Sequence, residues 1–192
     1  MMMEKHLHRL MYGLLFPAVL GTVFVVFLSE DLFSLRLYPR TFLGIVFVLH
    51  WSFEFILSTE KGAEHEYSAW KFLTELALIL VIYAAFRSLT PAMPMAAVEY
   101  TGFYLCVAFI PGIFMLQDIF LPVFTKFQTN WRLFGWDGFL LIVALACWHG
   151  SKEFPFLATN DYLVYGVIGL GFLVSLVSFL KRYMDLARNG SV

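Results

Sequence analysis

Charged side chains are scarce in this 192-residue chain. Asp, Glu, Lys and Arg make up 14 % of it and leave a formal net charge of -1, whereas about 25 % is usual in soluble domains. The chain has no block of basic residues and no interleaving of basic with aromatic side chains, which are the patterns typical of nucleic-acid binding. The sequence therefore argues against an ordinary soluble domain and against direct contact with nucleic acid.

Cysteine is nearly absent, and the common catalytic motifs are missing. Cys106 and Cys147 each lie inside an apolar stretch, so we interpret them as small packing residues rather than as a disulfide or a metal pair. No GxSxG, HExxH, CxxC or phosphate-loop pattern occurs. We therefore expect no cofactor, and the sequence favours a role without catalysis.

Apolar and aromatic residues dominate instead. Hydrophobic residues make up 60 % of the chain, with 22 Phe, 9 Tyr and 5 Trp, and the mean hydropathy is +0.77. A small soluble core would not hide so many rings, whereas a lipid-facing surface with interfacial aromatics accommodates them. The composition predicts an all-α integral membrane protein, a polytopic bundle of transmembrane helices.

The apolar runs predict about six transmembrane helices in a single domain over residues 1–192, because roughly 20 residues cross a hydrocarbon core. The expected spans are 11–29, 41–58, 69–86, 98–120, 137–150 and 162–180. The first is expected to be retained, since it is longer than a signal-peptide core and lacks a small-x-small cleavage pattern. The fifth is short, so five spans is the alternative if that segment is re-entrant or interfacial.

Polar segments are expected to connect these spans. Residues 59–68 form the most polar stretch, and Ser68 is expected to cap the helix that follows it. Residues 122–136 and 151–161 are expected to be further connections, the first of them partly at the membrane surface.

Lysine and arginine set the orientation, because they are enriched in cytoplasmic loops. With six spans, nine of the 13 such residues fall on the side that carries both termini. Both termini are therefore expected in the cytoplasm, with the protein in the inner or plasma membrane. The nine are Lys5, Arg9, Lys61, Lys71, Lys126, Arg132, Lys181, Arg182 and Arg188; the other four are Arg36, Arg40, Arg87 and Lys152.

The span at 41–58 is the most informative stretch, because two ionisable residues interrupt it. His50 and Glu54 are four residues apart, which places them on one helical face. Ionisable groups cost free energy in lipid, so this face is expected to meet protein or water.

Further acidic residues are expected at the same depth. In the predicted orientation Glu54, Glu75, Asp118 and Asp137 all lie in the cytoplasmic half of their spans, with His50 about one turn deeper. Clustered carboxylates that are shielded from water exchange protons near neutral pH, and an imidazole is a suitable relay. A metal site is an alternative, as is simple pairing with polar side chains of neighbouring helices.

A haem bound between His50 and His149 is a further hypothesis. The expected depths of the two histidines in the membrane argue against it. His149 ends the ascending fifth span near the outer surface, whereas His50 lies about 13 Å below the outer end of its own helix. Two axial ligands must face each other across one iron.

We therefore expect a transport or channel-type subunit with a proton or cation pathway through His50, Glu54, Glu75 and Asp118. Gly171, Ser175 and Ser178 share one face of the last span, which is typical of close helix packing within the chain or between the protomers of a homo-oligomer. The alternative is a non-catalytic sensor or anchor that recruits a cytoplasmic protein. Its docking residues would be Lys61, Glu64, Glu66, Lys126 and Arg132.

Overall fold

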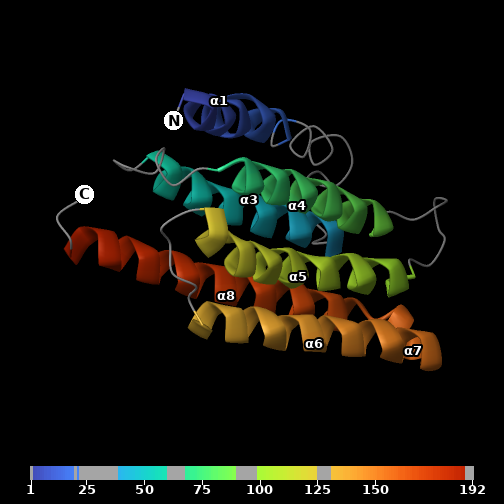
Figure 1. Ribbon diagram of the computed structural model, residues 1–192. Coiled ribbons are helices and arrows are strands. Elements are labelled where there is room, and N and C mark those ends of the chain that lie inside the picture. Colours follow the sequence, from blue (N-terminus) through green and yellow to red (C-terminus); the bar gives the residue numbers. More distant parts are fainter. Residues whose placement is uncertain are drawn as a thin grey trace. The chain divides into compact units, whose positions relative to one another are not determined.

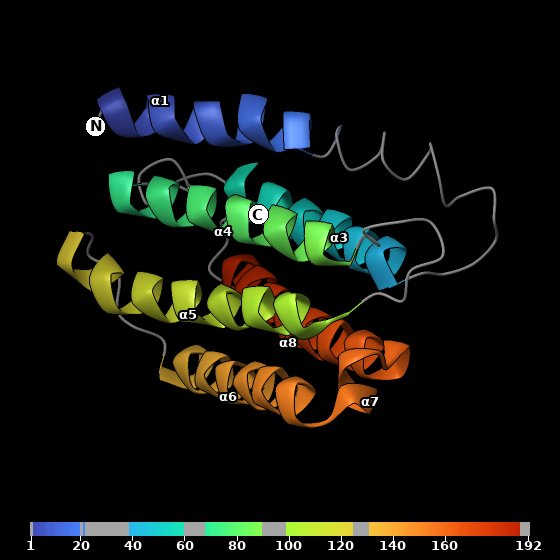
Figure 2. The same cartoon turned by 90° about the vertical axis from the view of Figure 1, so that its right-hand side faces the viewer.

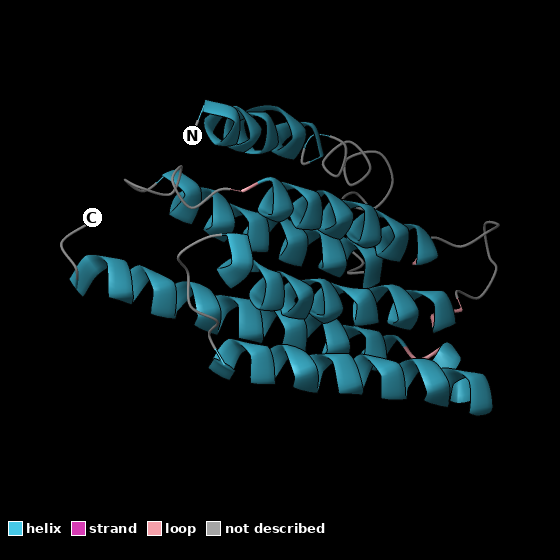
Figure 3. Ribbon diagram, in the orientation of Figure 1, coloured by secondary structure: helices cyan, strands magenta, loops and turns pink. Residues whose placement is uncertain are grey.

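Most of the residues that the computed structural model describes lie in helices; the described residues are 2–19, 21, 39–59, 68–89, 99–124 and 131–188. None of them lies in a strand (Figure 3). The all-α prediction is therefore confirmed. The elements (Figure 1) are α1 (Met2–Leu10), the π-helix η1 (Met11–Leu15), α3 (Pro39–Thr59), α4 (Ala69–Ser88), α5 (Thr101–Phe124), α6 (Trp131–Glu153), α7 (Pro155–Ala158) and α8 (Asp161–Arg188).

Three helices in the described part of the chain are long and apolar enough to cross a membrane. They are the segments Ala69–Ser88, Thr101–Phe120 and Asp161–Lys181. Much of the predicted first span, including residues 22–29, lies outside the described residues. Three such helices indicate a membrane protein.

The chain divides into two compact units. Unit 1 consists of Met1–Phe72 and Gly169–Val192, and unit 2 is the intervening segment Leu73–Ile168. α3 lies entirely in unit 1, whereas α5, α6 and α7 lie entirely in unit 2.

Aromatic packing holds the N-terminal segment of unit 1 to α3. Trp51 of α3 is 2 % exposed, and its ring centroid lies 4.6 Å from that of Phe16 and 6.4 Å from that of Tyr12. Tyr12 belongs to η1. Pro17 follows η1 and has no N–H to donate, so it interrupts the helical hydrogen-bond ladder where the wider π turn occurs.

Unit 2 is built on α5 and α6, which lie side by side (Figures 1 and 2). They run antiparallel, because the N–H of Tyr100, just before α5, donates to the carbonyl oxygen of Ala158, the last residue of the short α7 that follows α6. Phe103 and Tyr104 are fully buried, and Ala108 and Ala144 are nearly so.

The helix ends differ from the predicted connections at two places. Residues 131–136 belong to α6, and most of residues 151–161 is helical as well, with Pro155 opening α7. Proline suits the first turn of a helix because its missing N–H would have no partner there. The Ser68 cap is confirmed, since the Lys71 N–H donates to Ser68 Oγ over 3.1 Å.

Candidate polar site on the apolar helices

His50 makes a polar contact with α8 inside unit 1. Its Nδ1 and the Ser175 Oγ share a hydrogen bond of 2.5 Å. The ring of Phe53, on the same side of α3, stacks on Phe179 and Phe172 at centroid distances of 4.5 and 6.3 Å. One face of α3 therefore packs on α8 through a polar contact set among aromatic rings.

The serines of α8 have different partners. Ser178 Oγ donates to the Val174 carbonyl oxygen of its own helix over 2.9 Å, whereas Ser175 reaches His50. A Cβ built on Gly171 would meet no atom within 4 Å. The predicted packing role of this small-residue face between protomers stays a prediction.

Glu54 follows His50 by one helical turn and is half-buried. It takes part in interactions within the protein. His50 and Glu54 therefore both lie on α3 at the places that the helical spacing predicts.

Glu75 is the most buried acidic residue in the described part of the chain. It lies in unit 2 on α4 and is 8 % exposed, next to Thr74 at 6 % and Leu78 at 4 %. Glu75 also has interactions within the protein. Burial of a carboxylate in an apolar helix costs free energy that these interactions must offset.

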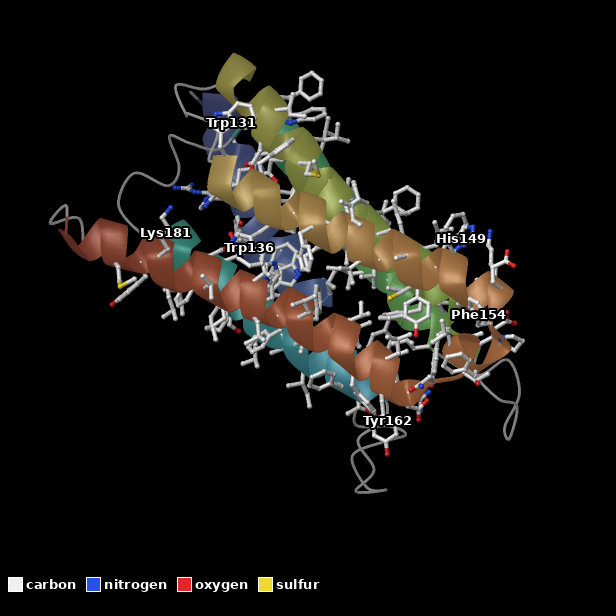
Figure 4. All side chains as sticks on the ribbon, turned by 90° about the horizontal axis from the view of Figure 1, so that it is seen from below. Trp131, Trp136, His149, Phe154, Tyr162 and Lys181 are labelled. Carbon is white, nitrogen blue, oxygen red and sulfur yellow. The ribbon has the colours of Figure 1, made fainter. Side chains whose placement is uncertain are left out.

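Asp118 and Asp137 belong to unit 2 as well, on α5 and α6, and both are half-buried. The predicted meeting of Glu54 with Glu75 involves both units and stays a prediction. His149, the second histidine of the haem hypothesis, is exposed near the end of α6 (Figure 4).

The metal and docking hypotheses have few described residues to support them. The described residues contain no group of three or more His, Cys, Asp and Glu side chains placed to hold a metal ion. Four of the expected docking residues, Lys61, Glu64, Glu66 and Lys126, lie outside the described ranges. Arg132 is in the first turn of α6.

The sequence did not predict a pair of tyrosine hydrogen bonds in unit 2, which we name the polar clamp: Tyr100 with Asp161, and Tyr104 with Leu157. The Tyr100 hydroxyl donates to Asp161 Oδ1, and the Tyr104 hydroxyl donates to the Leu157 carbonyl oxygen over 3.3 Å. Asn160 Oδ1 accepts from the Leu163 N–H over 3.2 Å and caps α8. The Asn160-Asp161 pair before an apolar run is the local signal that was available.

The surroundings of Tyr100 in the polar clamp raise the pKa of its phenol. Burial raises the pKa of its phenol above the ordinary value of 10.0, and the hydrogen bond to Asp161 raises it further. Tyr100 is 4 % exposed, so its hydroxyl stays a proton donor at neutral pH.

The fold and the polar contacts define a helical membrane protein with ionisable side chains in or beside its apolar helices. Comparison with protein families, curated proteins and solved structures gives no match.

Proposed function

We propose that this protein is a small multi-pass membrane subunit of the transport or channel type, with a proton or cation site formed by ionisable residues of its helices. The observation that carries the proposal is the burial of Glu75, at 8 % exposure, inside a helix that is apolar enough to cross a membrane. An intramembrane carboxylate is costly, and such groups mark ion and proton pathways.

The proposed topology has six spans with both termini in the cytoplasm of a cell whose inner or plasma membrane holds the protein. α3 has 21 residues and α6 has 23, which give about 31 and 34 Å of helix, enough to cross a hydrocarbon core of about 30 Å. They join the three apolar helices as proposed spans, and the N-terminal run supplies the sixth. Nine of the 13 lysines and arginines then lie on the cytoplasmic side.

The contact between His50 and Ser175 supports a polar path on α3. The imidazole lies in the interior of an apolar helix and shares its hydrogen bond with a hydroxyl of another apolar helix. An imidazole gains and loses a proton near neutral pH, so the side chain is a suitable proton relay. Together with Glu54, one turn away, it forms the part of the proposed pathway that α3 contributes, and Asp118 is proposed to continue the pathway on α5.

The site is expected to work in a homo-oligomer, because 192 residues enclose little space by themselves. The face with Gly171, Ser175 and Ser178 is the proposed contact between protomers, in addition to the contact of Ser175 with α3.

Flux measurements test the proposal. The purified protein is reconstituted in liposomes that contain a pH-sensitive dye, and proton or cation flux is recorded for the wild type, Glu75→Gln and Glu99→Gln. Glu99 is exposed, precedes α5 and is the matched control. We expect flux in the wild type and in Glu99→Gln and its loss in Glu75→Gln. Absence of flux in the wild type, or full flux in Glu75→Gln, would overturn the proposal.

A further inference from the structure

Unit 2 exposes three aromatic side chains around α7. Phe154 is 56 % exposed, Phe156 is 64 % exposed and Tyr162 is 86 % exposed. Figure 4 shows Phe154 beside the end of α6 that carries His149. We name these three residues the aromatic corner. Rings so exposed leave a large apolar area without protein contact, which indicates an environment other than bulk water.

The fold holds the aromatic corner in place. The Tyr100 N–H donates to the Ala158 carbonyl oxygen over 2.7 Å, and the Tyr104 hydroxyl bonds the Leu157 carbonyl. Gly150 allows α7 to approach α6 closely, because a Cβ there would lie 3.1 Å from Leu157 Cδ1. The outward direction of the aromatic corner is therefore a fixed feature of unit 2 and not a property of a loose loop.

The opposite end of α6 also exposes aromatic rings. Trp131 is 74 % exposed and Trp136 is 52 % exposed, and Trp131 lies at the far end of the helix from His149 (Figure 4). Between the two ends, Phe139, Ile142 and Leu145 are exposed at helical spacing. The 23 residues of α6 give a helix of about 34 Å, so Trp131 and the aromatic corner are separated by close to the thickness of a hydrocarbon core.

Charged groups surround the aromatic corner, which excludes the hydrocarbon interior as its environment. Glu153 and Asp161 are exposed there. The Lys152 ammonium nitrogen lies 3.7 Å from the centroid of the Trp148 ring, a cation–π contact that fixes a positive charge at this level. Aromatic rings beside fixed charges are typical of the headgroup region of a bilayer.

We infer that the aromatic corner lies in the headgroup boundary of a phospholipid bilayer, with Trp131 and Trp136 at the opposite boundary and the exposed stripe of α6 between them in the acyl chains. Phe154 and Phe156 lie where the headgroups meet the first acyl carbons, and Lys152 faces the lipid phosphates. This inference rests on the proposed membrane-spanning role of α6 and is independent of transport.

Nitroxide accessibility tests the depth of these residues. The full chain with Cys106→Ala and Cys147→Ala is reconstituted in nanodiscs of phosphatidylcholine and phosphatidylglycerol and labelled at Phe154→Cys, Phe156→Cys or Ile142→Cys, one site at a time. All three side chains are exposed, so the labels disturb little packing. Accessibility to oxygen, which enters lipid, is compared with accessibility to a water-soluble nickel chelate.

We expect the oxygen-to-nickel ratio to be highest at Ile142 and intermediate at Phe154 and Phe156, between Ile142 and a free nitroxide in buffer. A bulk-water ratio at both phenylalanine sites, with a lipid ratio at Ile142, would overturn the inference while α6 remains a span. A bulk-water ratio at Ile142 would overturn the span itself. Low accessibility to both reagents at the phenylalanine sites would mean that a second copy covers the corner, which also overturns the inference.

Discussion

His50 and Ser175 lie 125 residues apart in the sequence, yet the His50 Nδ1 and Ser175 Oγ atoms are 2.5 Å apart. The contact joins α3 to α8 within unit 1. A polar contact between apolar helices fixes their rotation and register, because any other arrangement leaves the imidazole without this partner.

Replacement of Ser175 by alanine is expected to destabilise unit 1. The change removes the hydroxyl that His50 contacts, and hydrogen bonds between membrane helices contribute about 0.6 kcal/mol on average and up to about 1.7 kcal/mol. Ser178→Ala is the matched control, because the Ser178 hydroxyl bonds the Val174 carbonyl oxygen of its own helix. Unfolding by titration with a denaturing detergent measures both losses. Equal losses would contradict a special role for Ser175.

Replacement of Tyr100 by phenylalanine is expected to destabilise unit 2 by about 1.5–3 kcal/mol, because the Asp161 carboxylate loses a donor. Since burial raises the folded-state pKa of Tyr100 above 10.0, its contribution is fully present below pH 10 and decreases as the pH rises through the folded-state pKa. The difference in unfolding free energy between wild type and Tyr100→Phe should therefore shrink above pH 10.

Tyr162→Phe is the control for that experiment, because Tyr162 is 86 % exposed. Its unfolding free energy is expected to match that of the wild type at neutral pH. A Tyr100→Phe difference that stays constant from neutral to strongly alkaline pH would contradict the assigned role of the buried phenol.

The sequence predicts the helices well, because a membrane helix is a local feature of length and hydropathy. α3, α4 and α8 contain the runs from which they were predicted, and α5 contains its run apart from residues 98–100. The ends of α6 were missed, since Arg132 and Lys152 resemble loop residues although charged side chains are common in the first and last turns of membrane helices.

The contacts of the candidate site are not local, and this is why they were not predicted. Tyr100 and Asp161 are 61 residues apart and lie at the starts of different helices. Helical periodicity shows which residues share a face of one helix, but it does not show which face of another helix meets it. For the same reason, the sequence does not predict that His50 pairs with Ser175.

Replacement of Gly150 by valine is expected to destabilise unit 2 by about 1–3 kcal/mol through overpacking. A Cβ at this position would lie 3.1 Å from Leu157 Cδ1, so the branched side chain displaces the Leu157 side chain from its packing against α6. Gly135→Val is the matched control on the same helix, where a Cβ meets nothing within 4 Å. Thermal unfolding in nanodiscs measures both variants, and a neutral Gly150→Val would show that α7 does not depend on this close approach.

Two replacements of Trp51 distinguish the contribution of its ring volume to stability from the contribution of its indole N–H. The side chain is 2 % exposed, and its Nε1 is buried without a hydrogen-bond partner among the residues that the structure describes. Trp51→Ala is expected to cost about 3–5 kcal/mol, because it leaves a cavity against Phe16 and Tyr12. Trp51→Phe should cost clearly less, since a ring still fills most of the space and the change removes a donor that has no acceptor among the described residues. Detergent-induced unfolding compares the two variants, and an equal loss would mean that the indole N–H has an acceptor in the membrane.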